Sequence, residues 1–261
     1  MATWNEDKPA LANQISADVP DIKENFEFLA LFARERRSIF TYNGGTTAYT
    51  IKCKSAYYYC KDKVCWWDAE LTTTAIGTPS ASDWYYLYLD HSGITSGTEI
   101  TNSELLWSAT EPAWNATYAA WMNGDDRCIF AARTDSGPSN ILEFFHDGDL
   151  VFYADAIADL AETDIDTTWT DQAITMPVFY RALVRFMSVY VDGSSSFSWR
   201  TNGQTGTTGH TVGYVTSEST RDSMHAPVYV DSAQKIEIKS SAANGNRVAV
   251  QTQGWYLPIG M

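Results

Sequence analysis

The sequence predicts a mainly β protein, with a short N-terminal helix followed by two antiparallel modules of the β-sandwich or jelly-roll kind. Two observations indicate this class. From residue 39 onward, short segments rich in aromatic and β-branched residues alternate with turns of Gly, Asn, Asp and Ser, and they recur at intervals of roughly 10–15 residues. The chain has 261 residues, of which 44% are hydrophobic and 14% aromatic, so it can bury a substantial core.

One segment near the N-terminus has the pattern of a helix. Asp18-Val19-Pro20-Asp21 supplies a capping residue, a proline in the first turn and an acid near the positive end of the helix dipole. Apolar residues then recur at helical spacing until the segment ends near Ser38, at positions Ile22, Phe26, Leu29 and Ala33. The stripe suits packing on the chain's own domain, and it also suits association with copies of itself.

The expected strands form two series. Trp84–Asp90 is a strong strand candidate, and Ala56–Cys60 and Val64–Thr73 are expected to form a hairpin around Lys61-Asp62-Lys63. The acidic residues 154–171 are interpreted as a short helix or loop that crosses to the second series. The expected divisions are an N-terminal segment 1–38, a middle β domain 39–175 and a C-terminal β-sandwich domain 176–261.

The negative charge is concentrated in one third of the chain. The formal net charge is −14, and residues 101–180 hold two arginines against 14 acidic residues. Binding to nucleic-acid phosphates requires Lys and Arg, so we expect no nucleic-acid partner. No run approaches the ~20 apolar residues of a membrane span. The polar start, Met1–Pro9, does not resemble a signal peptide. We therefore expect synthesis in the cytoplasm and no membrane insertion.

The four cysteines do not have the spacing of a zinc site. Six residues separate Cys53 from Cys60 and four separate Cys60 from Cys65, no histidine is nearby, and Cys128 stands alone. We expect buried free thiols, with a Cys60–Cys65 bridge as the alternative if the protein meets an oxidising environment. The acids of residues 155–171 suggest a cation loop but lack the EF-hand pattern, so a solvated crossover is favoured.

No catalytic motif stands out. The sequence has no G-x-S-x-G, H-E-x-x-H or G-x-x-x-x-G-K pattern. A carboxylate pair of a polysaccharide-degrading enzyme can be imagined among 32 acidic residues, but nothing singles one out. We therefore expect a protein that is not an enzyme and that uses no metal or cofactor.

Tryptophans provide the candidate contact residues. Trp66 and Trp67 are adjacent on an expected strand and must point to opposite faces, so either a neighbouring subunit helps to cover them or one is exposed. Trp107, Trp114 and Trp121 lie in a loop-rich region. They are candidates for contact with a glycan or a partner, although anchoring the loop is the favoured interpretation.

The N-terminal residues 3–10 (TWNEDKPA) and 14–26 (QISADVPDIKENF) resemble the opening of many tailed-bacteriophage virion proteins. Those openings combine a W-x(4)-P segment, an I-S-x-D-x-P-like turn and an I-x-x-N helix start, and they are typical of tail-fibre and appendage proteins. Tyr85–Asp90, with Glu111-Pro112 and Arg127–Phe130 before Phe144, looks like a β module of phage fibres. Gly254–Pro258 resembles the last strand of fibre heads.

This resemblance implies a structural virion protein, most simply a homotrimeric tail-fibre or appendage subunit whose partners are other tail or neck proteins. The C-terminal domain would contact a glycan or protein of the host surface. Attachment to the particle would involve the N-terminal residues Trp4, Pro9, Ile15, Ile22, Phe26 and Leu29. The alternatives are a collar or capsid-decorating fibre, and a lectin-like carbohydrate-binding module.

Overall fold

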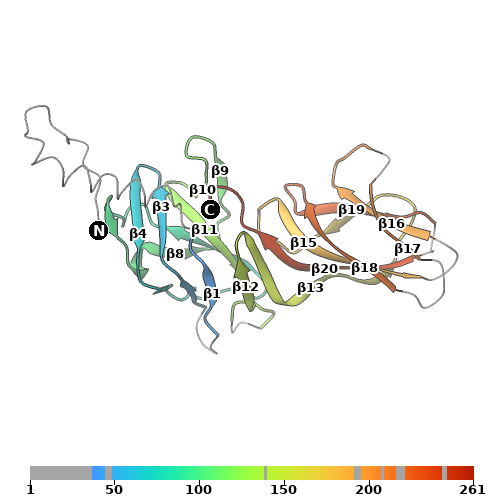
Figure 1. The fold of residues 1–261 in the computed structure, drawn as a ribbon, viewed down its shortest axis with the longest axis horizontal. Coiled ribbons are helices and arrows are strands. Elements are labelled where there is room, and N and C mark those ends of the chain that lie inside the picture. The colour runs from blue at the N-terminus through green and yellow to red at the C-terminus, as the bar shows by residue number, and fades with distance from the viewer. Residues whose placement is uncertain are drawn as a thin grey trace, which may run out of the picture. The chain divides into compact units, whose positions relative to one another are not determined.

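A computed structural model describes residues 37–44, 49–137, 140–190, 195–206, 209–215, 221–242 and 246–261. In this part of the chain, strands dominate and the one helical element is a short 3₁₀ turn, η1 (Asn102–Glu104), so the expected mainly β class is confirmed (Figure 1). The expected N-terminal helix lies outside the described residues. The chain divides into two compact units. Unit 1 extends to Asn140 and includes Met261, and unit 2 extends from Ile141 to Gly260.

Unit 1 is built around a five-stranded antiparallel sheet with the order β8-β6-β11-β10-β9. Its strands are β6 (Trp84–Leu89), β8 (Leu105–Ser108), β9 (Ala113–Asn115), β10 (Ala120–Asn123) and β11 (Asp126–Arg133). The expected strand at residues 84–90 is confirmed as β6, which lies between β8 and β11 and has buried side chains on both faces of the sheet. Such a central strand can be apolar along its whole length.

Two three-stranded sheets complete unit 1. One has the order β1-β2-β5 and consists of β1 (Phe40–Tyr42), β2 (Ile51–Cys53) and β5 (Leu71–Thr72). The other has the order β3-β4-β7 and consists of β3 (Ala56–Cys60), β4 (Lys63–Trp67) and β7 (Thr98–Glu99). The β3–β4 hairpin is confirmed, with Cys60 paired to Lys63 and Lys61 in the left-handed region. The expected strand Val64–Thr73 is divided, because β4 ends at Trp67 and Leu71–Thr72 form β5 of the other sheet.

The aromatic core of unit 1 corrects the expectation for Trp66 and Trp67. Both side chains are buried within this single chain, so neither a neighbouring subunit nor an exposed tryptophan is needed. Trp66 stacks on Tyr57 and Trp67 on Tyr58, with ring centres 6.1 and 5.7 Å apart. The Trp67 indole N–H also donates a hydrogen bond of 3.2 Å to the Cys53 carbonyl. The two faces of the hairpin are therefore covered by other parts of the same chain.

Unit 2 consists of two antiparallel sheets. The five-stranded sheet has the order β12-β13-β20-β15-β18 and consists of β12 (Phe144–Asp147), β13 (Leu150–Asp164), β15 (Arg181–Tyr190), β18 (Arg221–Tyr229) and β20 (Asn246–Tyr256). The four-stranded sheet has the order β14-β19-β16-β17 and consists of β14 (Thr170–Ala173), β16 (Ser195–Thr201), β17 (His210–Val215) and β19 (Lys235–Ser240).

The two sheets of unit 2 share one hydrophobic core. Phe186 of β15 contacts Phe197 and Trp199 of β16, with ring centres 5.4 and 5.6 Å apart. In β19, the buried residues Ile236 and Ile238 alternate with Glu237 and Lys239, which are partly exposed. This alternation gives the four-stranded sheet a buried inner face and a polar outer face. Unit 2 is therefore a sandwich of two antiparallel sheets.

The acidic segment 154–171 differs from its sequence interpretation. Instead of a short helix or loop, residues 150–164 form the long strand β13. From Ile157 onward, β13 pairs only with β20 among the described strands. Three register shifts interrupt the β13–β20 pairing as a whole. One edge of this stretch is thus unpaired in the sheet, and acidic side chains are common on such edges because they oppose pairing with other chains.

The division between the units also differs from the expected boundary at residue 175, because it falls between Asn140 and Ile141. Strand β13 pairs with β20, and β14 pairs with β19. These partners lie more than 60 residues further along the chain, beyond the reach of local sequence patterns. Pairing with late strands is what places residues 141–175 in unit 2.

Candidate functional site

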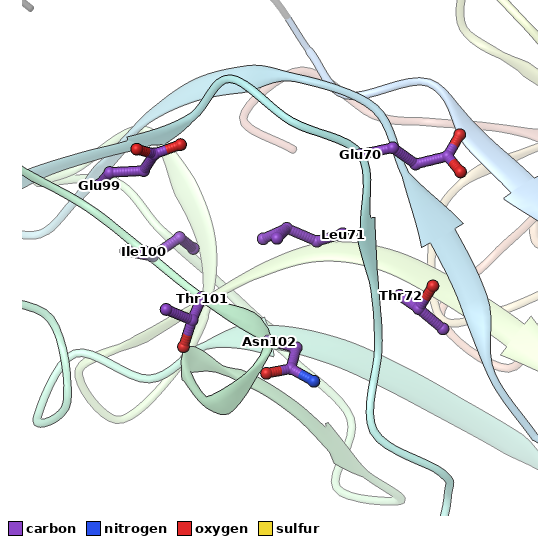
Figure 2. A pocket seen from close by; sticks show the side chains of 7 residues that line it. All are labelled: Glu70, Leu71, Thr72, Glu99, Ile100, Thr101 and Asn102. Carbon is purple, nitrogen blue, oxygen red and sulfur yellow. The ribbon is translucent and has the colours of Figure 1, made fainter.

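Two hollows lie among the described residues of the two units, one in unit 1 and one in unit 2. The hollow of unit 1 has a volume of about 430 Å³ and is lined by Glu70, Leu71, Thr72, Glu99, Ile100, Thr101 and Asn102. Figure 2 shows the two glutamates on opposite sides, with Leu71 and Ile100 between them. The hollow of unit 2, here called the Lys239 hollow, has a volume of about 410 Å³ and is lined by Thr167, Ser198, Gly209, Thr211, Lys239, Ser240 and Ser241.

The polar groups of the unit 1 hollow have local structural roles. The Glu70 carboxylate is 3.2 Å from Lys52 Nζ, and Glu99 accepts a hydrogen bond of 3.0 Å from the Asp68 N–H. Thr101 caps η1 and exchanges hydrogen bonds with Glu104. These contacts give both glutamates and Thr101 partners within the chain.

The Lys239 hollow lies on the outer face of the four-stranded sheet. In register, Ser198 of β16 faces Lys239 of β19 on one side and Thr211 of β17 on the other. Directly opposed residues of an antiparallel pair point to the same face. The sequence neighbours Phe197 and Ile238 are buried in the core of the sandwich, so the row of Thr211, Ser198 and Lys239 points outward.

Trp169, just before β14, lies beside this hollow. The Lys239 ammonium is 4.6 Å and the Arg200 guanidinium carbon 4.3 Å from the centre of its ring, distances typical of cation–π contacts. Arg200 forms a bidentate pair with Glu237, with N–O distances of 2.7 and 3.1 Å. A methyl group added at Gly209 would come within 2.5 Å of the indole edge. The ring thus lies between the Arg200–Glu237 pair, which joins β16 to β19, and Gly209, just before β17.

Sequence reasoning did not single out Trp169. Its neighbours Asp166, Thr167, Thr168, Thr170 and Asp171 are polar, which favoured the interpretation as a solvated crossover. The sequence does contain one signal for this site, the alternation of apolar and charged residues in β19, in which Glu237 and Lys239 indicate a polar outer face. Pairing of β14 with β19 places Trp169 beside that face.

The three predicted contact tryptophans do not form one surface. Trp114 and Trp121 are cross-strand partners in β9 and β10, with ring centres 6.0 Å apart in an edge-to-face arrangement. Trp107 lies in β8, at the opposite edge of the same sheet, and its indole N–H donates to Thr73 Oγ1 at 3.2 Å. Trp121 is buried and Trp114 is 44% exposed, so Trp114 is the member of this trio that offers most of its surface to a partner.

The predicted attachment residues lie outside the described residues. They are Trp4, Pro9, Ile15, Ile22, Phe26 and Leu29. Their role remains a prediction of the sequence resemblance.

All four cysteines are free and buried, in agreement with the expected free thiols. Cys65 pairs in register with Tyr58, and Cys60 with Lys63, so the two cysteines are not opposite each other in the hairpin. Burial raises the pKa of the Cys60 thiol to about 11 and that of Cys65 to about 12. Both thiols are therefore protonated at neutral pH and are poor nucleophiles.

The acids of residues 155–171 have separate partners. Asp164 contacts Arg247 at 3.2 Å, and Asp171 contacts Lys235 at 3.1 Å. Asp159 accepts hydrogen bonds from the Thr175 N–H and the Thr252 hydroxyl. Within the described ranges, no group of three or more His, Cys, Asp or Glu residues is arranged to hold a metal ion.

One histidine–carboxylate pair resembles part of a catalytic site. His91 Nε2 is 2.6 Å from Asp62 Oδ1, and this hydrogen bond holds the pKa of Asp62 below its usual range. The adjacent hydroxyl of Ser92 donates to Asp90 at 2.7 Å instead of to the imidazole. The pair thus joins the β3–β4 turn to the loop after β6, as a surface contact between two segments.

No protein-family model matches this sequence, and no curated protein matches it significantly. Among the described residues, no helix is long and apolar enough to cross a membrane. The fold and the two hollows define a mainly β protein with two units, one of which carries a polar, hydroxyl-lined hollow beside an indole ring.

Proposed function

We propose that this protein is a structural subunit of a tailed-bacteriophage virion, a tail-fibre or appendage protein that attaches to the particle through residues 1–38. The observation that carries the proposal is the N-terminal pattern of residues 3–26, which resembles the openings of such proteins. The mainly antiparallel β architecture in two units supports it, because fibre and appendage proteins are commonly assembled from β modules.

The proposal includes the finer features expected from the sequence. In this proposal a short helix begins after Asp18 and ends before residue 37, and its apolar stripe of Ile22, Phe26 and Leu29 packs against the same stripe of two other copies. Unit 2 acts as the host-facing module, with a sandwich of the jelly-roll kind. The virion contains the protein as a homotrimer, assembled in the host cytoplasm and bound to tail or neck proteins.

Deletion of residues 1–36 tests the attachment role and keeps Ser38, which is buried and hydrogen-bonded to Tyr58 and Lys54. In phage that carry this gene, the truncated protein should fold but should be missing from purified particles when these are probed with an antibody against the β units. Circular dichroism of the purified truncation checks that the β structure is kept. A matched control is Phe145→Ala, which removes an exposed side chain of unit 2 and should leave incorporation unchanged. Normal incorporation of the truncation would refute attachment through this segment.

The position of bound antibody on imaged particles distinguishes a tail fibre from a collar or capsid-decorating fibre. Labelling at the tail tip or baseplate supports the tail assignment, whereas labelling at the neck or over the capsid supports the alternatives. Light scattering of the purified full chain tests the oligomer. A homotrimer has three times the chain mass of 29.1 kDa, and a monomeric mass at micromolar concentration would contradict it.

A further inference from the structure

The Lys239 hollow is rich in groups that bind hydroxylated ligands. Five of its seven lining residues are serine or threonine. Ser241 Oγ accepts a hydrogen bond of 2.8 Å from the Ser196 N–H, and Ser240 Oγ accepts one of 3.3 Å from the Ala242 N–H. Ser240 is buried, whereas Ser241 is exposed and its hydroxyl keeps its own proton for donation to a ligand. A ligand with many hydroxyl groups matches this lining better than an apolar one.

Lys239 adds one positive charge to the hollow. In the described part of the chain it forms no ion pair, whereas Lys235 on the same strand pairs with Asp171. A partly buried ammonium is stabilised by an anionic partner. The free cation therefore selects a ligand that carries a negative charge.

Trp169 supplies an apolar surface beside these polar groups. Its ring contacts the Lys239 ammonium and is held in place by the Arg200–Glu237 pair, whose side chains are only 11% and 14% exposed. An aromatic ring fixed next to hydrogen-bonding groups suits a ligand with one apolar face and several polar edges. A sugar ring has this character, since its axial C–H groups form an apolar face and its hydroxyls lie at the edge.

We propose that the Lys239 hollow binds an acidic saccharide, a sugar residue that carries a carboxylate. The carboxylate pairs with the Lys239 ammonium, the ring hydroxyls bond to Ser198 and Thr211, and the apolar face of the sugar lies against Trp169. The inference deepens the proposed host-facing role of unit 2. Its test uses the purified full chain, so that a failure here is distinct from a failure of particle attachment.

The first experiment screens the full chain on an array of uronic-acid and sialic-acid oligosaccharides together with their carboxyl-reduced counterparts. Binding to acidic members, with loss on carboxyl reduction and weakening at high salt, is the expected result. No binding to any member by the folded protein would overturn the proposal. Equal binding to the reduced members would also overturn it, because the ammonium would then play no selective part.

Variants locate the binding in this hollow. Lys239→Gln should weaken binding to the acidic oligosaccharide selected from the array by about tenfold or more, as expected for loss of a hydrogen bond between charged groups. The matched control Lys235→Gln removes a charge from the same strand outside the hollow and should leave affinity within about twofold, because exposed ion pairs contribute little. Unchanged affinity in Lys239→Gln would overturn the assignment to this site.

Trp169 provides a second, independent readout. Trp169→Ala should lower the affinity, and Gly209→Ala should do the same while keeping every binding side chain, because the new methyl group collides with the indole and with the Trp199 carbonyl. Circular dichroism confirms that each variant is folded. Inorganic phosphate and sulfate serve as competitors. If either displaces the saccharide at the saccharide's own concentration, the hollow is a simple anion site and the saccharide assignment is wrong.

Discussion

At the scale of single residues, environment decides what a tryptophan contributes. Trp67 is fully buried, stacks on Tyr58 and donates a hydrogen bond to the Cys53 carbonyl. Trp114 belongs to the same unit but is 44% exposed and contacts Trp121 by one edge. Both residues were recognised from the sequence, but their burial depends on strands far away in the chain.

Replacement of these two tryptophans should therefore have unequal effects on stability. Trp67→Ala should lower the free energy of unfolding of unit 1 by about 3–5 kcal/mol, because it removes a large core side chain and leaves a cavity. Trp114→Ala should cost only about 0.5–1.5 kcal/mol, the usual contribution of an aromatic pair. Urea unfolding followed by circular dichroism measures both, and equal losses would contradict the assigned burial.

Asp90 predicts a pH dependence for unit 1. Its carboxylate accepts hydrogen bonds from the Ser92 hydroxyl, at 2.7 Å, and from the Ser92 N–H, at 2.9 Å, and the hydroxyl bond in particular lowers the pKa of Asp90. Because its pKa is lower in the folded than in the unfolded chain, Asp90 stabilises the folded state fully above about pH 4, near the unfolded pKa. That contribution disappears as the pH falls through the lowered native pKa.

The Asp90→Asn variant should accordingly be less stable than the wild type at pH 7 and should lose less stability between neutral pH and pH 2. Denaturation midpoints measured across this range provide the test. Ser92→Ala removes the hydroxyl donor but leaves the carboxylate, so it should show a smaller change in the same direction. A variant whose pH profile is parallel to that of the wild type would show that Asp90 has no such role.

At the scale of elements, the close pairing of β13 with β20 depends on Gly254. This residue pairs with Phe152, and a Cβ atom at position 254 would be 2.2 Å from the Val151 carbonyl oxygen and 3.0 Å from the Phe152 Cα. Both neighbours are backbone atoms, which cannot turn away as a flexible side chain can. The glycine therefore permits the approach of two long strands.

Gly254→Ala should lower the stability of unit 2 by about 1–3 kcal/mol, the usual cost of forcing extra volume into a packed site. Gly77→Ala is the control, because a Cβ there meets nothing within 4 Å. It should change stability by less than about 0.5 kcal/mol. Thermal or urea unfolding compares the two variants. A neutral Gly254→Ala would mean that β13 and β20 can separate at this point without loss.

At the scale of the whole molecule, the strands of each sheet all come from one unit. Every strand of unit 2 pairs with another strand of unit 2, and Phe186 of one sheet packs against Phe197 of the other. The sequence expectation placed residues 141–175, which include β12, β13 and β14, in a different domain. Without them the five-stranded sheet would lose β13, the partner of β20, and the four-stranded sheet would lose β14, the partner of β19.

This division predicts different behaviour for two fragments. A fragment of residues 141–260 should fold alone and unfold in one cooperative transition, because it contains a complete two-sheet core. A fragment of residues 176–261, the domain expected from the sequence, should be much less stable or aggregate, because it exposes the edges of β19 and β20. Circular dichroism and size-exclusion chromatography compare them, and equal stability of the two would contradict the division at Asn140.

The sequence by itself determined the mainly β class, the β3–β4 hairpin, the buried strand at residues 84–90 and the free thiols. These features follow from local information, namely side-chain alternation, tight-turn residues and cysteine spacing. The resemblance of residues 3–26 to the openings of phage virion proteins stays a prediction, and the proposed function depends on it.

Only the tertiary structure decided the boundary of the units, the strand formed by residues 150–164 and the site around Lys239. Thr211, Ser198, Lys239 and Trp169 come from four separate segments, and pairing of β14, β19, β16 and β17 brings them together. The β14–β19 and β19–β16 pairings join residues that are distant in the chain. The side of the sheet on which a residue lies also depends on a register that a shift of one position would reverse. A local pattern cannot specify such pairings, so the candidate site becomes visible only in the folded chain.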